Sequence, residues 1–276
     1  MSDGWSRPVT VDEMYGDWDD EAAVAALDRS LGPRRSTALL DVVGSLGVGP
    51  GDVVLDIGGR DGAHALMMAD RFGCRAISVD PVAANLEHGR DQVAAHASGH
   101  LVDLLAGSME RIPVGDAGVR VVFARDMLAH VDDLALGLSE CRRVLSPGGH
   151  MVVFGVFATP RLYPDERAEL CADLATLPER LSAAAFETAV ADAGFTIVHR
   201  EVTGSEFVEA NQEAGITPNY LLQLSRLRRA RQSLLDELGE IPYRVMYGNA
   251  LWSVYRVLGK LEGRIYVLQR DDRSGR

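Results

Sequence analysis

The sequence predicts an α/β fold in which a mostly parallel sheet carries helices on both faces. The apolar run 53–55 predicts a buried strand, which leads through the glycine-rich turn 58–62 into an apolar-periodic helix over 63–72. Strand-like segments then alternate with helical ones, the order that βαβ units and parallel sheets produce. A later helix ends before the turn 147–149, Pro-Gly-Gly, and a buried strand follows it.

Seven strands are expected in order along the chain. A helix that Ser36 caps and that runs to Leu46 precedes the first strand. Gly73 ends the helix after that strand, and the second strand closes on Asp80. A helix over 82–97 comes next. The strands after the first are predicted over 75–80, over 101–107, from 119, after 149, in the second half of 185–203 and over 263–271.

Composition excludes several classes of function. The chain has 276 residues, 47% of them hydrophobic, and a formal net charge of −12, so no electrostatic footprint for nucleic acid or membrane is present. The acidic, polar N-terminus has no apolar signal core, and no run of 18 apolar residues occurs. Cys74, Cys141 and Cys171 lie far apart without metal-ligand spacing, so we expect reduced thiols, no metal and a cytoplasmic location. Oligomeric state stays open, with a homodimer as one option.

The glycine-rich turn is the part of the sequence that points to a ligand. A turn from strand to helix presents backbone N–H groups to a nucleotide-like molecule. The dinucleotide fingerprint G-x-G-x-x-G fails here at Arg60 and Ala63. Asp80 lies at the carboxyl end of the next strand, where a carboxylate accepts hydrogen bonds from both ribose hydroxyls of an adenosine. A helix N-cap with Pro81 at the first helical position is the alternative role for this region.

The pattern acid-x-Gly-x-x-x-Gly, formed by Asp56, Gly58 and Gly62, resembles motif I of the class I S-adenosylmethionine-dependent methyltransferases. The resemblance implies S-adenosylmethionine as cofactor, with Asp56, Gly58, Gly59 and Gly62 holding its amino-acid end. It also implies a Rossmann-like sheet of seven strands whose last two are antiparallel, and the Pro-Gly-Gly turn is typical of the family. Arg60 departs from the family pattern, which has a glycine there. A tight turn without any ligand would use the same glycines.

Other residues take cofactor roles by the same resemblance. Ser108 stands where the family has an acid that contacts the adenine amino group, and Met109 would pack on the ring. Pro81 and Arg125 follow the second strand and end the fourth, and are expected to contact the cofactor as well. Tyr15, in a segment that resembles an N-terminal family motif, would close over the cofactor or pin the N-terminal arm to the domain.

One methyltransferase domain over the whole chain is the expected organisation. A long segment separates the sixth and seventh predicted strands, and its apolar stripes predict two helices that roof the acceptor pocket with Trp252 and Tyr255. The expected parts are an N-terminal arm 1–35, a cofactor-binding core 36–203, a helical acceptor-site insertion 204–262, and a last strand and tail 263–276.

The acceptor is expected to be a small molecule, because the long insertion resembles the subgroup that acts on natural products, sugars and phosphobases. His130 is the candidate base for a hydroxyl acceptor of a secondary metabolite, although it could merely line the pocket. The neighbourhood of Phe154 has no acid to assist it, so carbon and nitrogen acceptors stay open, including anionic isoprenoid or phosphorylated ones. The basic run, Arg226, Arg228, Arg229 and Arg231, is either a solvated face or a clamp for such an anion.

Two functions of other classes remain as alternatives. A nicotinamide-dependent oxidoreductase would also use Asp80, but Arg60 and Ala63 disfavour it. A non-catalytic cofactor-binding scaffold is suggested by Arg60 and Ser108, which replace the usual family residues.

Overall fold

The computed structural model describes residues 7–16 and 20–271, which form two compact units, Met1–Pro33 and Arg34–Arg276. The first unit holds α1 (Val11–Met14) and α2 (Asp20–Asp28). Thr10 caps α1: its hydroxyl accepts from the Glu13 backbone N–H at 3.2 Å, and the Glu13 carboxylate accepts from the Thr10 N–H at 2.9 Å. Tyr15 is the residue that ends α1. The segment around Tyr15 that resembles a family motif spans residues 14–20, and residues 17–19 of it lie outside the described residues.

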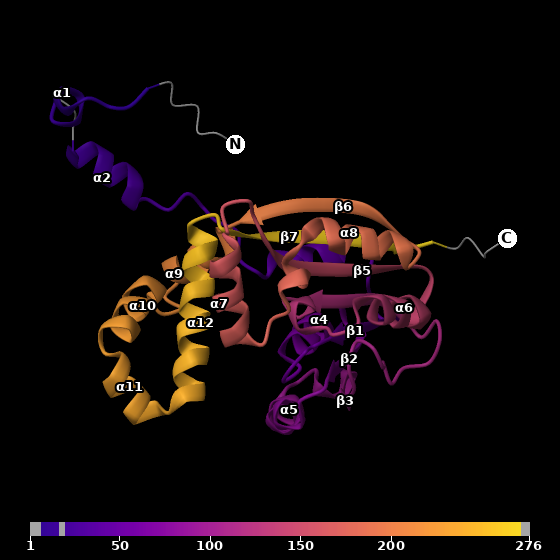
Figure 1. Cartoon of the computed structure of the whole chain (residues 1–276). Helices are drawn as coiled ribbons and strands as arrows, with labels where there is room; N and C mark the ends of the chain where they lie inside the picture. The colour runs from indigo at the N-terminus through magenta and orange to yellow at the C-terminus, as the bar shows by residue number, and fades with distance from the viewer. Residues whose placement is uncertain (1–6, 17–19, 272–276) are drawn as a thin grey trace. The chain divides into compact units, whose positions relative to one another are not determined.

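A single seven-stranded sheet with the order β3-β2-β1-β4-β5-β7-β6 forms the centre of the second unit (Figure 1). Strands β1 to β5 run parallel, and β7 lies antiparallel between β5 and β6. This confirms the predicted α/β class, the seven strands and the antiparallel last pair. The strands are β1 (Val53–Ile57), β2 (Arg75–Asp80), β3 (Val102–Ala106), β4 (Val119–Arg125), β5 (Leu145–Ala158), β6 (Phe195–Gly204) and β7 (Leu261–Arg270).

Helices cover both faces of the sheet, and each face has its own apolar core. One core packs α6 and α8 onto one face through Leu138, Phe186 and Phe157. The other core packs α3 and the helices after β6 onto the opposite face, and it includes Leu39 and Phe154. The helices are α3 (Ala38–Ser45), α4 (Ala63–Phe72), α5 (Ala83–Ala95), α6 (Leu134–Val144), α7 (Pro164–Leu174), α8 (Ala183–Asp192), α9 (Glu206–Glu213), α10 (Tyr220–Arg229), α11 (Arg231–Leu238) and α12 (Glu240–Val257).

The Pro-Gly-Gly turn lies within β5 and does not precede it, contrary to the prediction. Leu145 pairs with Val119 and His150 with Val121, so the Pro-Gly-Gly residues form an irregularity between two paired stretches. Gly148 has φ +69°, which favours glycine, and the peptide chain continues along the same neighbour on both sides of it. The turn therefore interrupts one long strand and does not mark the start of that strand.

The segment between β6 and β7 contains four helices, α9 to α12, instead of the predicted two. The apolar stripe is continuous in sequence, but the helix breaks at Ala230 (φ −107°, ψ 30°) and again at Gly239 (φ +83°). Asn219 caps α10 by accepting from the Leu222 N–H at 3.0 Å. These helices lie together beside α7, next to the ends of β5 and β7 (Figure 1). Helix α12 packs on both α7 and α10.

Candidate functional site

A cavity of about 1010 Å³ opens at the carboxyl edge of the sheet. It lies over the loops that follow β1, β2, β3 and β4, next to the point between β1 and β4 where the strand order reverses. Open α/β sheets bind their ligands at this point. Nine of the predicted site residues line the cavity: Asp56, Gly58, Gly59, Asp80, Pro81, Ser108, Met109, Arg125 and His130.

Three predicted residues lie elsewhere in the second unit, and Tyr15 belongs to the first. Gly62 is the N-cap of α4, with φ +78°, and does not line the cavity. Trp252 and Tyr255 lie on α12 and are not among the lining residues. The Tyr255 ring is buried, with the Lys260 Nζ 5.1 Å from its centroid. Their contact with an acceptor stays a prediction.

The glycine turn is held close to β2. The N–H groups of Gly58 and Gly59 both donate to the Val79 carbonyl, at 2.8 and 3.2 Å. A Cβ on Gly59 would lie 2.2 Å from the Ser78 Oγ and 2.5 Å from the Asp56 Oδ2, distances no folded side chain tolerates. The turn thus needs glycine at 59 because the backbone passes directly over buried oxygen atoms.

Asp80 connects this turn to the start of α5. Its Oδ2 accepts from the Arg60 backbone N–H at 2.9 Å, and its Oδ1 accepts from the Val82 N–H at 2.9 Å and the Asn85 Nδ2 at 3.0 Å. Arg60 adopts φ +52°, a left-handed conformation that is costly for a residue with a side chain. The helix begins at Ala83, so Pro81 is not its first residue, contrary to the alternative considered for this region. The carboxylate keeps part of its acceptor capacity and lines the cavity.

Asp56 is buried in β1, close to Arg125 at the end of β4. Burial raises the pKa of Asp56 to about 7, although the positive charge of Arg125 and a hydrogen bond from the Ala65 N–H oppose this. Its Oδ2 is buried with no hydrogen-bond partner among the described residues. Arg125 Nη1 donates to His64 Nε2, and burial lowers the pKa of His64 to about 4, so this imidazole is neutral. The acid of the motif therefore sits at neutral pH near its titration point.

We expect the raised pKa of Asp56 to appear in the pH dependence of stability. The pKa is higher in the folded state than the 3.8 of an unperturbed carboxyl, so the folded protein binds more protons between these values. Stability should then fall as the pH rises from 4 to 7, by about 1 kcal/mol per pH unit for this one group. Asp56→Asn should remove that slope. Urea unfolding of both proteins at pH 5, 6 and 7 measures it, and Asp103→Asn, an exposed position, serves as control. Parallel curves for wild type and Asp56→Asn would contradict the assignment.

His130 lies at the rim of the cavity with one defined tautomer. Its Nδ1 is 2.9 Å from the Ala175 carbonyl oxygen, which only accepts, so Nδ1 carries the hydrogen. The lone pair is then on Nε2, the nitrogen that a general base needs. His130 is exposed and lines the cavity together with Asp132 and Asp133. The arrangement is suited to taking a proton from a ligand in the cavity.

The loop after β3 closes the cavity at the end where adenine is predicted to bind. Met109 is buried and packs on Gly137 of α6. Ser108 and Arg111 hold the turn through backbone hydrogen bonds in both directions. The carboxylate of Glu110, which also lines the cavity, accepts from the Asp132 N–H at 3.1 Å. Loop 108–110 and loop 130–133 are therefore fastened to each other.

Sequence reasoning assigned no role to several polar residues that line the cavity, among them His64, Asn85 and Glu110, and it placed Asp126 only at the functional edge of the sheet. Each follows a strand end by only a few residues, which is the signal that could have found them. Asp126 also adopts φ +54°, a strained conformation at the end of β4 that the sequence does not reveal. Within the described ranges, 7–16 and 20–271, no three His, Cys, Asp or Glu side chains are placed to hold a metal, and no helix has the length and apolar character to cross a membrane.

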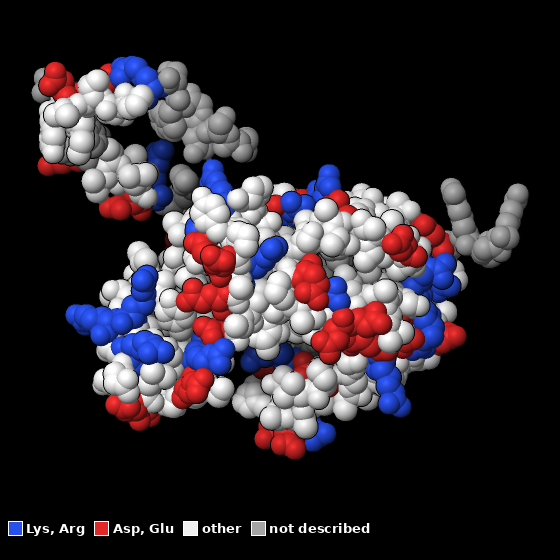
Figure 2. Space-filling model, in the orientation of Figure 1, with Lys and Arg blue, Asp and Glu red and all other residues white. Residues whose placement is uncertain are grey.

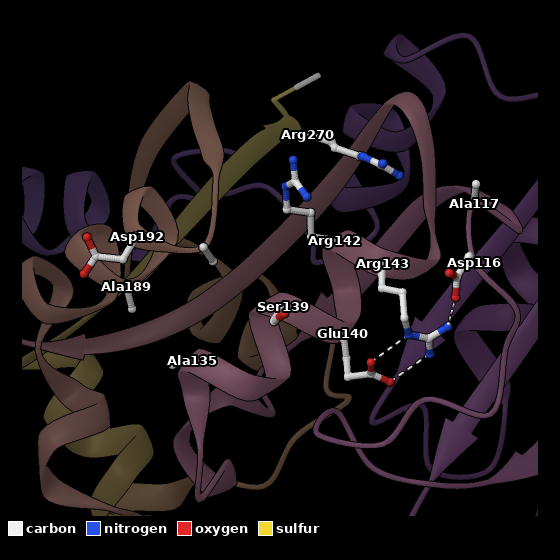
Figure 3. A pocket seen from close by; sticks show the side chains of 11 residues that line it. Asp116, Ala117, Ala135, Ser139, Glu140, Arg142, Arg143, Ala189, Asp192 and Arg270 are labelled. Atoms are coloured by element: carbon white, nitrogen blue, oxygen red, sulfur yellow. Dashed lines mark hydrogen bonds and ion pairs between the residues drawn. The ribbon is translucent and has the colours of Figure 1, made fainter. Parts of the chain in front are cut away.

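A second cavity, of about 670 Å³, lies near the opposite edge of the sheet (Figure 3). Several of its charged side chains already have partners: Arg143 donates to Glu140 and to Asp116, both at 2.7 Å. Arg142 donates to the backbone carbonyl of Asp271 at 2.8 Å. This hollow is a surface between α6 and α8 whose charges are used within the fold.

Comparison with known proteins shows similarity to methyltransferases. Residues 55–153 match the sequence profile of a methyltransferase domain. The chain is 28% identical over 134 residues to a sarcosine/dimethylglycine N-methyltransferase of Halorhodospira halochloris, covering 49% of this chain and 46% of that protein. It is 32% identical over 143 residues to a malonyl-[acyl-carrier protein] O-methyltransferase of Serratia marcescens, covering 51% and 49%. The chain thus spans about half the length of these relatives.

Solved structures show the same fold over more of the chain. A geranyl diphosphate C-methyltransferase of Streptomyces coelicolor superposes with a TM-score of 0.65 at 18% identity, covering 85% of this chain and 77% of that one. A protein of Galdieria sulphuraria that is assigned as a sarcosine dimethylglycine methyltransferase reaches 0.66 at 15% identity, covering 85% and 84%.

Proposed function

Residues 55–153 of this chain match a methyltransferase domain, and on that premise we propose that the protein transfers a methyl group from S-adenosylmethionine to a small-molecule acceptor. The observation that carries this proposal is the single cavity wall that unites the glycine turn, Asp80 and His130. The cofactor supplies a methyl group on a positively charged sulfur, which leaves as a neutral thioether.

The residues of the cavity fit the cofactor. Asp80 would accept from the ribose hydroxyls, and loop 108–110 would enclose the adenine. The unpartnered Asp56 Oδ2 and the backbone of Gly58 and Gly59, which line the cavity, would face the amino-acid end. Aligning donor and acceptor in a cavity that excludes water supplies much of the acceleration in such reactions. Tyr15 closing over the cofactor belongs to the same proposal.

For the acceptor, we propose a hydroxyl group of a secondary metabolite, with His130 as the base. The Nε2 lone pair, fixed by the hydrogen bond of Nδ1 to Ala175, supports this role. A nitrogen or carbon acceptor has no hydroxyl proton for His130 to remove. The relatives include both an N-methyltransferase and an O-methyltransferase. Trp252 and Tyr255 remain proposed contacts of the acceptor, and the cytoplasmic location and a homodimer remain proposals.

His130→Ala should lower turnover at least about tenfold while the affinity for adenosylhomocysteine changes less than about twofold. The pH profile of the rate should also differ between wild type and variant, because only the wild type has the proposed base. Release of adenosylhomocysteine with a panel of hydroxyl, amine and carbon acceptors measures it. His88→Ala, on exposed α5, is the control. An unchanged pH profile would show that His130 only shapes the cavity.

Calorimetry distinguishes the proposed cofactor from the alternatives. We expect adenosylhomocysteine to bind and NAD not to bind. Binding of NAD alone would favour an oxidoreductase. Binding of adenosylhomocysteine without turnover on any acceptor of the panel would favour a non-catalytic scaffold.

A further inference from the structure

Arg256, near the end of α12, is a buried cation with no ion-pair partner in the part of the chain that the structure describes. It is 8% exposed, and its Nε and Nη2 atoms are buried without a hydrogen-bond partner. Its guanidinium lies over the ring of Phe154 on β5, with Cζ 5.7 Å from the ring centroid. A buried charge left unpaired is costly, so an arginine in this state has donors available for a ligand.

Arg125 lies on the same face of the sheet as Arg256. Arg125 of β4 and Phe154 of β5 are register partners in a parallel pair, so their side chains leave the sheet on one side. The Arg125 Nε is also buried without a partner, while its Nη1 donates to His64. Burial lowers the pKa of Arg256, the Asp126 carboxylate opposes this, and the positive charge of Arg125 lowers the pKa further. The two guanidinium groups are therefore electrostatic neighbours.

The carboxylates near Arg125 and Arg256 do not balance the positive charge of both guanidinium groups. Asp126 is exposed at the rim of the cavity, and its backbone N–H donates to the Phe154 carbonyl at 2.8 Å. Asp56 lies on the other side of Arg125, and burial raises its pKa to about 7, so at neutral pH it carries only part of a charge. Of the described carboxylates, Asp126 at the rim is thus the one that interacts electrostatically with both guanidinium groups.

We propose that Arg125 and Arg256 together bind an oxyanion of the methyl acceptor, a carboxylate or a phosphate. The inference deepens the proposed methyl transfer and depends on it for the identity of the ligand. Guanidinium groups recognise both kinds of oxyanion through paired N–H donors. On this proposal the methyl acceptor is an anionic small molecule.

The position of Arg256 separates the acceptor from the cofactor. Arg125, which the family resemblance assigned to the cofactor, belongs to the pair in this proposal. The other residues assigned to the cofactor in the second unit belong to or follow β1, β2 and β3, whereas Arg256 rests on β5, on the far side of β4. The exposed arginines that the sequence offered as a clamp, Arg226, Arg228, Arg229 and Arg231, lie on α10 and α11. Basic side chains gather over that end of the molecule on the face shown in Figure 2. They form a solvated surface, and the buried arginine on α12 takes the role considered for them.

Titration with small anions tests the pair. Inorganic diphosphate and malonate are titrated calorimetrically into the protein saturated with adenosylhomocysteine. We expect the wild type to bind at least one of them, and Arg256→Met to weaken that binding at least tenfold, as loss of charged hydrogen bonds predicts. Arg228→Met, an exposed arginine of α10, should bind within twofold of wild type. Tighter binding of diphosphate indicates a phosphorylated acceptor, and tighter binding of malonate a carboxylate.

The affinity for adenosylhomocysteine is the second readout and should stay within twofold in Arg256→Met. An equal loss of anion and adenosylhomocysteine binding would overturn the proposal, because the pair would then hold the cofactor carboxylate. Wild-type anion affinity in Arg256→Met, or no anion binding by the wild type, would also overturn it. If Arg256→Met does not fold, Arg256→Lys keeps the charge without the planar fork and should weaken binding threefold or more. A wild type that fails to bind adenosylhomocysteine would instead refute the proposed function, and the diphosphate titration of the free protein would still test the pair.

Discussion

Asp80→Ala should weaken adenosylhomocysteine binding by about 30- to 900-fold, which corresponds to about 2–4 kcal/mol. Two ribose hydroxyls would lose a charged acceptor. The variant also frees the N–H groups of Arg60 and Val82 and the Asn85 amide, all of which now donate to this carboxylate. The glycine turn and the start of α5 would then lose their common anchor. Calorimetric titration with adenosylhomocysteine measures the effect.

The control for Asp80→Ala is Asp103→Ala. Asp103 is an exposed carboxylate of β3 that pairs with Arg75 at 2.8 Å, away from the cavity. We expect its affinity for adenosylhomocysteine to stay within twofold of wild type, since exposed ion pairs contribute little. Wild-type affinity in a cooperatively folded Asp80→Ala protein would refute ribose recognition by Asp80 and leave it as an anchor of the loop.

Gly59→Ala should abolish most cofactor binding and lower the free energy of unfolding by about 1–3 kcal/mol. The added methyl group would lie within 2.5 Å of both the Ser78 Oγ and the Asp56 Oδ2, and both residues are buried. The turn must move away from β2 to admit it, which displaces the backbone that would face the cofactor. Urea unfolding and titration with adenosylhomocysteine give the two readouts.

Gly49→Ala is the matched control for Gly59→Ala. Gly49 precedes β1, needs no positive φ, and a Cβ added to it would have no other atom within 4 Å. Its free energy of unfolding should stay within about 0.5 kcal/mol of wild type. The double variant Gly59→Ala/Ser78→Ala should recover part of the lost stability, because one of the two clashing oxygens is gone. Equal stability and affinity of Gly59→Ala and wild type would show that the turn adapts freely.

The strongest sequence predictions concern segments whose structure is decided locally. The apolar run of β1, the glycines after it and Asp80 at the end of β2 carry their own conformational requirements, and the structure places the glycine turn and Asp80 at one cavity. The break at Ala230 could not be predicted, because alanine favours a helix and the apolar stripe passes through it unchanged. Tertiary packing of α10 and α11 on α12 decides it.

Arg256 shows the same limit at the candidate site. In the sequence it is one arginine in an amphipathic helix, where a solvated position is the reasonable expectation. Its burial depends on Phe154, a residue of β5 about a hundred positions earlier in the chain. Contacts of that sequence separation leave no local pattern. The buried arginine was therefore visible only in the structure, while the exposed basic run drew attention in the sequence.

The position of β7 between β5 and β6 has a consequence for folding during synthesis. Among the described strands, β6 pairs with β7 and with no other, and α9 to α12 separate the two along the chain. While the ribosome makes these helices, β6 has no strand to join, although β1 to β5 can already pair. Val198 and Val202 of β6 are exposed apolar residues on this edge of the finished sheet. Unpaired strands of this kind aggregate readily. The interval before β7 emerges is thus when the nascent chain most needs a chaperone.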